Sequence, residues 1–338
     1  MNILLGKFGQ KIIFNRDSKE CDRSNTNGNV GTYLLFKLLI ENNKKDTFYI
    51  ASENDLSTFE EMPFKNVVDA SGMDWEYLER MNIDAMFVLT GLTQFEKDDR
   101  FIRIVNCLSA RFILLSDDPR CLDSVSEDYR ITRQPNVIIS QFSGMYNFKD
   151  IPHEVRYEPI ERASCYGCEI YNDEKEIDMV IISNTSGKEY DRVKILSDVV
   201  DGSSGISIYG RLSDDEKESL GKDNCKGEVK YTEMQEVLRK SSSTFMVPIK
   251  KSWVTSKYVE ALMNGVLPIF HEDYNTYLLE NSSELIVIRN KEEFSNVLKE
   301  IKENKNKIDY LVKKWTKLMI EPFTNGKKLS NILMRYVR

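Results

Sequence analysis

Histidine is nearly absent from this chain of 338 residues, which contains only His153 and His271. Neither histidine stands in a Ser/His/Asp spacing that can be defended, so nucleophilic catalysis driven by histidine is poorly supported. His271 follows an apolar run that we expect to form a buried strand. Contact with a ligand is conceivable at that position, but a structural role is favoured.

Patterned cysteines and long apolar runs are missing too. The six cysteines are scattered, and Cys165 and Cys168 form one CxxC motif without a second pair, so a zinc site is not expected. No apolar run approaches the roughly 18 residues of a membrane span. Residues Met1 to Gly6 are too short and lack the charge pattern for a signal peptide. Together these absences predict a cytoplasmic protein with reduced thiols and no membrane partner.

An excess of positive charge is also lacking. The net charge of −7 argues against a large basic surface for non-specific binding of nucleic acid. A local basic cleft stays open, because lysines cluster at Lys250-Lys251 and at Lys313, Lys314 and Lys317. The length suits about two domains of an ordinary globular protein.

The sequence does contain a regular alternation of short apolar runs and helical stretches. Strands are predicted at residues 2–6, 48–51, 66–69, 85–90, 111–115 and 137–139, and again at 179–182, 206–209, 244–247, 266–270 and 285–288. Helices are predicted at 31–40, 101–108, 189–199, 234–239, 256–264, 292–301, 306–319 and 327–336. This alternation is typical of doubly wound parallel sheets, and it occurs twice. Residues 150–176 break it, and we interpret them as the connection between domains.

In open α/β sheets, ligands bind outside the carboxyl ends of the strands. We therefore expect a site in a cleft between the two halves. Its lining should include the chain from Gly6 onwards, residues 116–120, residues 184–187, Gly210 and the start of the helix at 256.

Lys257 and Glu260 lie three residues apart near the start of that helix, so they share one helix face. A cation and a carboxylate there could grip an anion and a sugar diol together. The alternative is a surface ion pair of little energetic weight. Gly265 can take the left-handed conformation that ends a helix. The apolar run from Val266 to Phe270 is typical of a buried parallel strand.

Two further segments follow predicted strands. The first, Asn184 to Lys188, precedes a helix, where free N–H groups favour a phosphate; an ordinary capped helix start is the alternative. It has neither the dinucleotide fingerprint nor the P-loop pattern. The second, Ser116-Asp117-Asp118, offers candidate general bases. Its alternatives are a turn capped by aspartate and oxygen ligands for a divalent cation.

These motifs resemble those of the bacteriophage DNA β-glucosyltransferases, GT-B enzymes that move glucose from UDP-glucose onto 5-hydroxymethylcytosine in duplex DNA. Lys257 to Glu260, followed by the turn and strand at 264–269, is similar to the family's Arg-x-x-Glu helix start. Leu115 to Arg120 is similar to its Phe-Thr-Asp-x-Arg. Tyr157 to Glu161 resembles its Tyr-x-Pro-Ile-Glu, and Ile139 to Gln141 resembles its Ile-Ser-Gln. The likeness covers most of the chain.

The resemblance implies a role for each matching residue. Glu260 would hold the ribose hydroxyls and Lys257 the diphosphate. Asp117 would be the catalytic base, with Asp118 as the alternate. Val229 would make backbone contacts to uracil. The other residues implied for the nucleotide sugar are Ser186, Gly187, Lys188, Arg192, Gly210 and Gly227, and those implied for the acceptor are Thr32 and Arg120.

The chain departs from the family pattern at three of these places. Lys257 stands where the family has arginine, and lysine gives a point charge instead of a fork. The family's Gly-Ser-x-Arg loop corresponds to Asn184 to Gly187 without the arginine, so Arg192 or Lys188 would substitute. The family's acidic residue near the acceptor corresponds to about Gly31-Thr32, where no carboxylate stands.

We therefore predict a GT-B fold with two Rossmann-like domains, residues 1–165 and 166–321, and a C-terminal segment, 322–338, that crosses back onto the first. The expected reaction is inverting transfer of a sugar, glucose by resemblance, from a UDP-sugar to a hydroxymethylated pyrimidine flipped out of duplex DNA. A Mg²⁺ or Mn²⁺ ion could assist, although no metal motif is visible. A monomer in the cytoplasm of an infected bacterial host is expected.

Two alternatives remain. The first is a GT-B enzyme with a protein, lipid or small-molecule acceptor. The second is a catalytically idle module that binds a nucleotide sugar or DNA.

Overall fold

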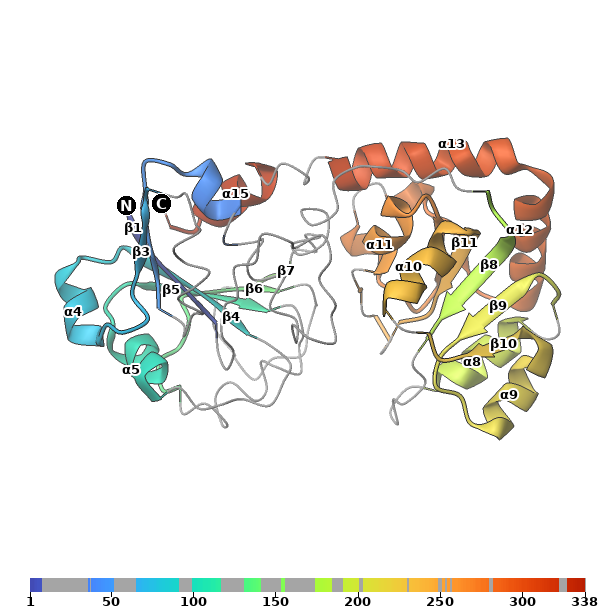
Figure 1. Ribbon diagram of the computed structural model, residues 1–338, viewed down its shortest axis with the longest axis horizontal. Helices are drawn as coiled ribbons and strands as arrows, with labels where there is room; N and C mark the ends of the chain where they lie inside the picture. Colours follow the sequence, from blue (N-terminus) through green and yellow to red (C-terminus); the bar gives the residue numbers. More distant parts are fainter. Residues whose placement is uncertain are drawn as a thin grey trace. The chain divides into compact units, whose positions relative to one another are not determined.

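The chain divides into two compact units, Met1–Cys165 with Asn325–Arg338, and Tyr166–Thr324. Each unit is described by itself (Figure 1). The computed structural model describes residues 1–7, 36, 38–51, 65–90, 99–116, 131–140, 153–155, 174–183, 191–200, 203–229, 231–248, 251–252, 254–255, 257–279, 282–321 and 327–337. None of the helices in these ranges is long and apolar enough to cross a membrane.

In its described part, the first unit is built on a parallel sheet of seven strands in the order β3-β2-β1-β4-β5-β6-β7. The strands are β1 (Asn2–Lys7), β2 (Thr47–Ile50), β3 (Val67–Asp69), β4 (Ala85–Thr90), β5 (Arg111–Ser116), β6 (Val137–Ser140) and β7 (His153–Val155). The described helices of this unit are α4 (Trp75–Arg80), α5 (Asp99–Cys107) and α15 (Lys327–Met334).

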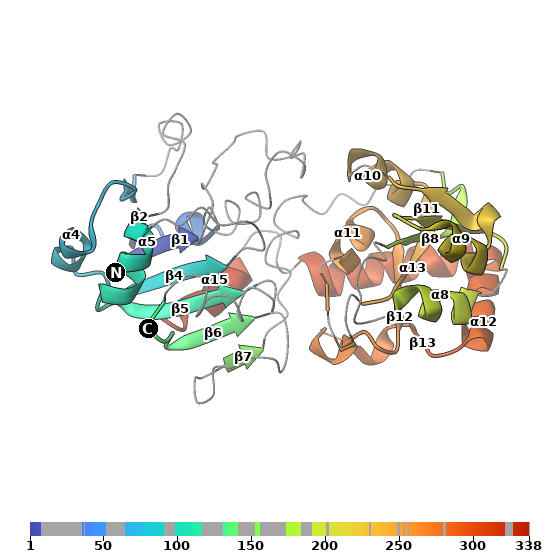
Figure 2. The same ribbon diagram turned by 90° about the horizontal axis from the view of Figure 1, so that it is seen from below.

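Helices cover both faces of this sheet, which explains why its interior strands β1, β4 and β5 are mostly apolar. Leu4, Met86 and Phe112 lie in one buried cluster with Phe101 and Ile104 of α5. Figure 1 shows α15 on the opposite face, and Figure 2 shows the same strands from below.

The C-terminal helix therefore packs on the first unit although the second unit precedes it in the chain. The Nδ2 group of Asn43, which directly follows helical residues 38–42, donates a hydrogen bond of 2.6 Å to Ser330 Oγ of α15. The predicted crossing of the C-terminal segment is confirmed.

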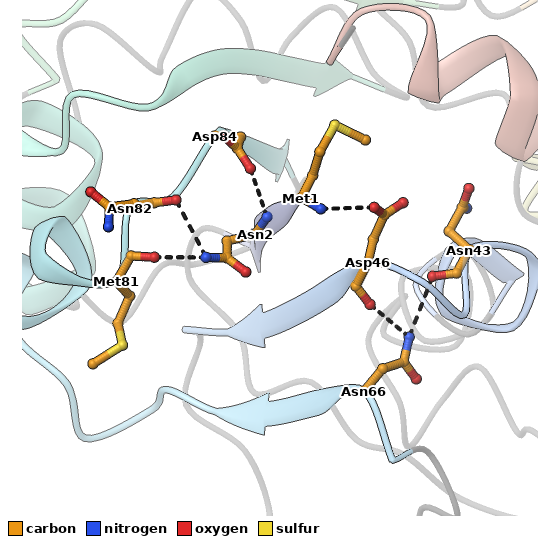
Figure 3. A network of polar contacts seen from close by, with 8 residues as sticks. All are labelled: Met1, Asn2, Asn43, Asp46, Asn66, Met81, Asn82 and Asp84. Carbon is orange, nitrogen blue, oxygen red and sulfur yellow. Dashed lines mark hydrogen bonds and ion pairs between the residues drawn. The ribbon is translucent and has the colours of Figure 1, made fainter.

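Side chains tie together the amino ends of the first sheet (Figure 3). The N–H of Asn2 donates to Asp84 Oδ2 at 2.7 Å, which joins the starts of β1 and β4. The amino group of Met1 lies 2.9 Å from Asp46 Oδ1, just before β2. Asn66, just before β3, donates from Nδ2 to the carbonyl of Asp46 at 3.0 Å. Polar groups at these strand starts thus satisfy one another within the unit.

The second unit repeats this topology. Its described strands pair in parallel in the order β10-β9-β8-β11-β12-β13. They are β8 (Ile177–Ile182), β9 (Ile206–Tyr209), β10 (Cys225–Gly227), β11 (Ser241–Met246), β12 (Leu267–His271) and β13 (Val287–Ile288). The helices are α8 (Arg192–Val200), α9 (Asp214–Leu220), α10 (Tyr231–Arg239), α11 (Lys257–Met263), α12 (Lys291–Glu303) and α13 (Lys305–Trp315), with short helical turns at Lys222–Asn224, Thr276–Leu278, Ser282–Glu284 and Thr316–Ile320.

Both sheets reverse their strand order at the first strand of the unit. In the first sheet the reversal lies between β1 and β4, and in the second it lies between β8 and β11. At such a switch point the connections leave the two central strands towards opposite sides, which opens a crevice at their carboxyl ends. The doubly wound α/β organisation predicted from the sequence is confirmed, and it places the candidate site.

Two strands were not expected. β7 lies within residues 150–176, which the sequence suggested were only a connection, so residues 137–139 do not form the last strand of the first sheet. Gly227 ends β10, where the sequence suggested only a turn. Both strands have three residues and pair at a sheet edge. A segment of three residues is too short to show the alternating hydrophobic pattern that identifies a strand in a sequence.

We expect the substitution Leu333→Ala to destabilise the first unit by about 2–5 kcal/mol, because this leucine of α15 is fully buried. Hydrogen exchange should show faster opening of β1 and β4 with little change in β8 and β11. Asn331→Ala is the matched control, since Asn331 is an exposed residue of the same helix. Faster exchange confined to the second sheet would contradict the placement of α15.

Candidate nucleotide-sugar site

A small cavity of about 40 Å³ lies at the switch point of the second sheet. Much of its lining comes from three segments. They are the end of β8 with the residue after it (Ile181 to Ser183), the end of β11 with the residue after it (Thr244 to Val247), and the start of α11. Thr255, Lys257, Glu260 and Tyr274 contribute polar groups. The cavity therefore occupies the position where open α/β sheets bind ligands.

Helix α11 presents Lys257 and Glu260 to this cavity. Every residue from Tyr258 to Met263 is buried, so the helix is enclosed nearly all round. It ends at Gly265, whose φ of 68° is left-handed as the sequence predicted. The N–H of Val266 donates to the carbonyl of Ala261 at 2.9 Å, and that of Gly265 donates to Leu262 at 3.1 Å. This pattern is a Schellman motif, and it fixes the turn into β12.

Glu260 is only 5% exposed. A carboxylate is rarely buried unless charged or hydrogen-bonding groups surround it. The Nζ group of Lys257 lines the same cavity and donates to the carbonyl of Ile182, at the end of β8, over 3.1 Å. The burial of Glu260 rules out a solvated ion pair on the helix surface, which was the alternative from sequence.

Ser183 is a site residue that the sequence prediction missed. Its hydroxyl is buried, lines the cavity and has no hydrogen-bond partner in the part of the chain that the structure describes. An unsatisfied buried hydroxyl is uncommon, and a bound ligand is one way to satisfy it. The signal in the sequence was its place directly after an apolar strand, one residue before the segment that we singled out.

The ends of the neighbouring strands are packed against Ser183. Its N–H donates to the carbonyl of Tyr209 at 2.9 Å, and the N–H of Gly210 donates to the carbonyl of Gly227 at 2.9 Å. A β-carbon on Gly210 would lie 1.9 Å from the carbonyl oxygen of Ser183. Only glycine allows this approach, so Gly210 has a steric role at the edge of the cavity. Val229 follows β10 and is half-buried.

Arg192 begins α8 and is buried, outside the lining of the cavity. The remaining predicted site residues lie outside the described ranges: Thr32, Asp117, Asp118, Arg120, Ser186, Gly187 and Lys188. Strand β5 ends at Ser116, which pairs with Ser140 and Thr90. Asp117 therefore directly follows the carboxyl end of a central strand of the first sheet.

His271 ends β12 in a buried position. Burial lowers its pKa below the ordinary value, although Asp273 opposes this shift. Its Nδ1 accepts a hydrogen bond of 3.2 Å from the N–H of Asp273, which requires an unprotonated Nδ1. Its ring lies edge-on to Phe245 at 6.2 Å. These contacts favour the structural role. The described residues contain no group of three or more His, Cys, Asp or Glu that could hold a metal ion.

In sequence, the chain matches no protein-family model and no curated protein. In structure, it is similar to a DNA-modifying β-glucosyltransferase, with a TM-score of 0.64 and 13% identity over 100% of this chain and 99% of that one. The β-glucosyltransferase of T4 phage with its UDP-glucose substrate gives 0.64 and 12% over the same shares.

More distant structures share the same architecture. An α-glucosyltransferase bound to UDP and a DNA 13-mer gives a TM-score of 0.53 at 12% identity, over 98% of this chain and 100% of that one. An O-GlcNAc transferase of Thermobaculum terrenum gives 0.56 at 10%, over 99% of this chain and 67% of that one. The chain thus has the GT-B fold of these glycosyltransferases, as the sequence predicted.

We expect Gly210→Ala to destabilise the second unit by about 1–3 kcal/mol, because the added methyl group would overlap a backbone carbonyl that cannot rotate away. Urea unfolding would measure the loss. Gly72→Ala is the matched control, since a β-carbon there meets no atom within 4 Å. Equal stability of the two variants would contradict the close approach of β9 to Ser183.

Proposed function

We propose that the protein is a glycosyltransferase that uses a UDP-sugar donor. The observation that carries this proposal is the cavity at the switch point of the second sheet, where the buried carboxylate of Glu260 and the ammonium of Lys257 lie together. A nucleotide sugar has a ribose diol, which can donate hydrogen bonds to the carboxylate. It also has a diphosphate, which can pair with the ammonium. The fold shared with UDP-glucose-dependent enzymes supports the same conclusion.

The proposed donor site has three parts. Glu260 accepts hydrogen bonds from the two ribose hydroxyls, and Lys257 neutralises the diphosphate. Val229, which follows β10, offers backbone groups to uracil, and Gly210 and Gly227, at the ends of β9 and β10, bracket the uracil and the diphosphate. Ser186, Gly187 and Lys188, between β8 and α8, and Arg192, the first residue of α8, complete the phosphate site, because the N-terminus of a helix favours negative charge.

The proposed reaction is a single displacement at the anomeric carbon. The acceptor oxygen attacks that carbon as its proton passes to the carboxylate of Asp117, with Asp118 as the alternate base. The bond between the anomeric carbon and the diphosphate oxygen breaks, and the configuration inverts. Lys257 stabilises the charge that develops on the leaving diphosphate. A complex of the T4 phage enzyme contains UDP and Mn²⁺, but no step proposed here is assigned to a metal ion.

We further propose that the acceptor is a hydroxymethylated pyrimidine in duplex DNA and that the sugar is glucose. Two enzymes with this fold support this choice, one described as DNA-modifying and one crystallised with DNA. The acceptor base would be flipped out of the duplex to reach the anomeric carbon. Thr32 and Arg120 are the proposed acceptor contacts. The protein would then act as a monomer in the cytoplasm of a phage-infected bacterium.

The second candidate is a GT-B enzyme with another acceptor, such as a protein, a lipid or a small molecule. The O-GlcNAc transferase with the same fold favours it. So does the net charge of −7, which is unfavourable for binding a polyanion. The two candidates share the donor site and differ only in what the first unit binds.

Incubation with labelled UDP-sugars and duplex DNA tests the acceptor directly. The duplexes would carry 5-hydroxymethylcytosine, 5-hydroxymethyluracil or unmodified pyrimidines. We expect transfer of label to a hydroxymethylated duplex only. If UDP-sugar binds but no duplex is labelled, the second candidate is favoured instead.

Asp117→Ala should reduce turnover to near zero and leave UDP-sugar affinity unchanged, because a catalytic base contributes to the chemical step and not to donor binding. Asp118→Ala tests the alternate base, and it should keep most of the activity if Asp117 is the base. Steady-state kinetics and calorimetry together separate the two effects. Full turnover in the Asp117 variant would contradict the assignment of Asp117 as the catalytic base.

Glu260→Gln should weaken binding of UDP about 10-fold or more, because a hydrogen bond to a charged group contributes about 1.5–3 kcal/mol. The variant should also discriminate less between UDP and 2′-deoxy-UDP. Glu303→Gln is the control, since Glu303 is an exposed carboxylate at the end of α12. Unchanged discrimination between the two nucleotides would show that Glu260 does not contact the ribose.

A further inference from the structure

Tyr274 lies three residues after the end of β12 and is only 3% exposed. Its ring packs against Phe270 with 5.0 Å between centroids. Its backbone N–H donates to the carbonyl of His271 at 2.9 Å. The residue is thus anchored to the end of β12, and it lines the cavity.

Within the described ranges, the hydroxyl of Tyr274 makes three hydrogen-bond contacts, all with Thr255. It donates to the carbonyl of Thr255 at 2.6 Å and accepts from the N–H of Thr255 at 2.7 Å. Thr255 Oγ1 lies 3.0 Å away and must be the donor, because the phenol has only one proton. Burial raises the pKa of Tyr274 well above its ordinary value, so the hydroxyl keeps this proton.

Two further contacts hold the segment just before Thr255 to Asp273, the residue before Tyr274. The N–H of Ser252 donates to the carbonyl of Asp273 at 2.7 Å, and Lys251 Nζ lies 3.4 Å from Asp273 Oδ1. Ser252 has a φ of 66°, which a residue other than glycine keeps only where its surroundings impose it. Adjacent residues after β12 therefore hold the chain that leads into α11.

This chain determines where the charges of α11 point. Thr255 stands two residues before Lys257, and both line the cavity together with Glu260 and Tyr274. The ammonium of Lys257 donates a hydrogen bond of 3.1 Å to the carbonyl of Ile182. A shift of Thr255 would be passed to the first turn of the helix, since only the residue at 256 separates it from Lys257.

We propose that Tyr274 is a positioning residue of the nucleotide-sugar site. Its hydroxyl fixes Thr255 and thereby aims Lys257 and Glu260 at the donor. In this role the hydroxyl of Tyr274 bonds to Thr255 and does not need to contact the ligand. The inference rests on the proposed function, because it assigns the residue that preorganises the proposed donor site.

The substitution Tyr274→Phe keeps the ring and removes only the hydroxyl. We expect the affinity for UDP, measured by calorimetry well below the unfolding temperature, to fall between about 10- and 100-fold, as for groups displaced from productive geometry. Tyr310→Phe is the matched control, because Tyr310 is an exposed tyrosine on α13 and should leave affinity unchanged.

A double-mutant cycle separates positioning from mere stabilisation. If Tyr274 acts through Lys257, the double variant Tyr274→Phe/Lys257→Ala should lose less affinity than the product of the two single losses. A purely structural role predicts a lower unfolding temperature with wild-type affinity in the folded protein. That result would overturn the inference.

Thr255→Val provides a second variant should Tyr274→Phe not fold. It removes one of the three contacts and leaves the backbone groups in place, so we expect a smaller loss of UDP affinity. Unchanged affinity would count against the inference. A wild-type protein that does not bind UDP would instead remove the proposed function itself, whereas normal wild-type binding with unaffected variants would remove only the role of Tyr274.

Discussion

The reversal of strand order at β8 is the constraint on which the second unit depends. β8 pairs with β9 on one side and with β11 on the other, and all three strands run parallel. Because connections from the two central strands leave towards opposite sides, the carboxyl ends between them stay uncovered. Ser183, directly after β8, and Lys257, at the start of α11, both line the cavity there. The chemistry proposed for the protein needs this gap, and the strand order creates it.

The carboxylate of Glu260 lines this gap, although the buried surroundings of its helix do not favour a charged group. Helix α11 is buried along almost its whole length, and such a helix is normally apolar all round. Glu260 breaks that rule, and a residue that conflicts with its environment often marks function. Its helix is supported from the other end, where Asn264 Nδ2 donates to the carbonyl of Glu260 at 2.8 Å and to Gln235 Oε1 at 2.7 Å.

The opposite ends of the strands have a different role. In the first sheet, side chains such as Asn2, Asp46 and Asp84 satisfy the polar groups at the strand starts. In the second sheet, Lys175 donates to the carbonyl of Arg239 at 2.7 Å, just before β11. Polar groups that already form hydrogen bonds within the protein have little hydrogen-bonding capacity left for a ligand. The amino ends therefore support the fold, and the carboxyl ends of the same strands remain available for binding.

The sequence by itself determined the elements that rest on local pattern. The apolar runs of the buried strands, the left-handed Gly265 and the shared helix face of Lys257 and Glu260 all depend on spacing along the chain. The edge strands β7 and β10 were not predicted, because a strand of three residues is too short to show a hydrophobic pattern. Ser183, Gly210 and Tyr274 acquired their roles only in the tertiary structure. Ser183 contacts Tyr209, Gly210 contacts Gly227, and Tyr274 contacts Thr255, which lies 19 residues away in the chain. Packing alone decides which of these distant groups meet.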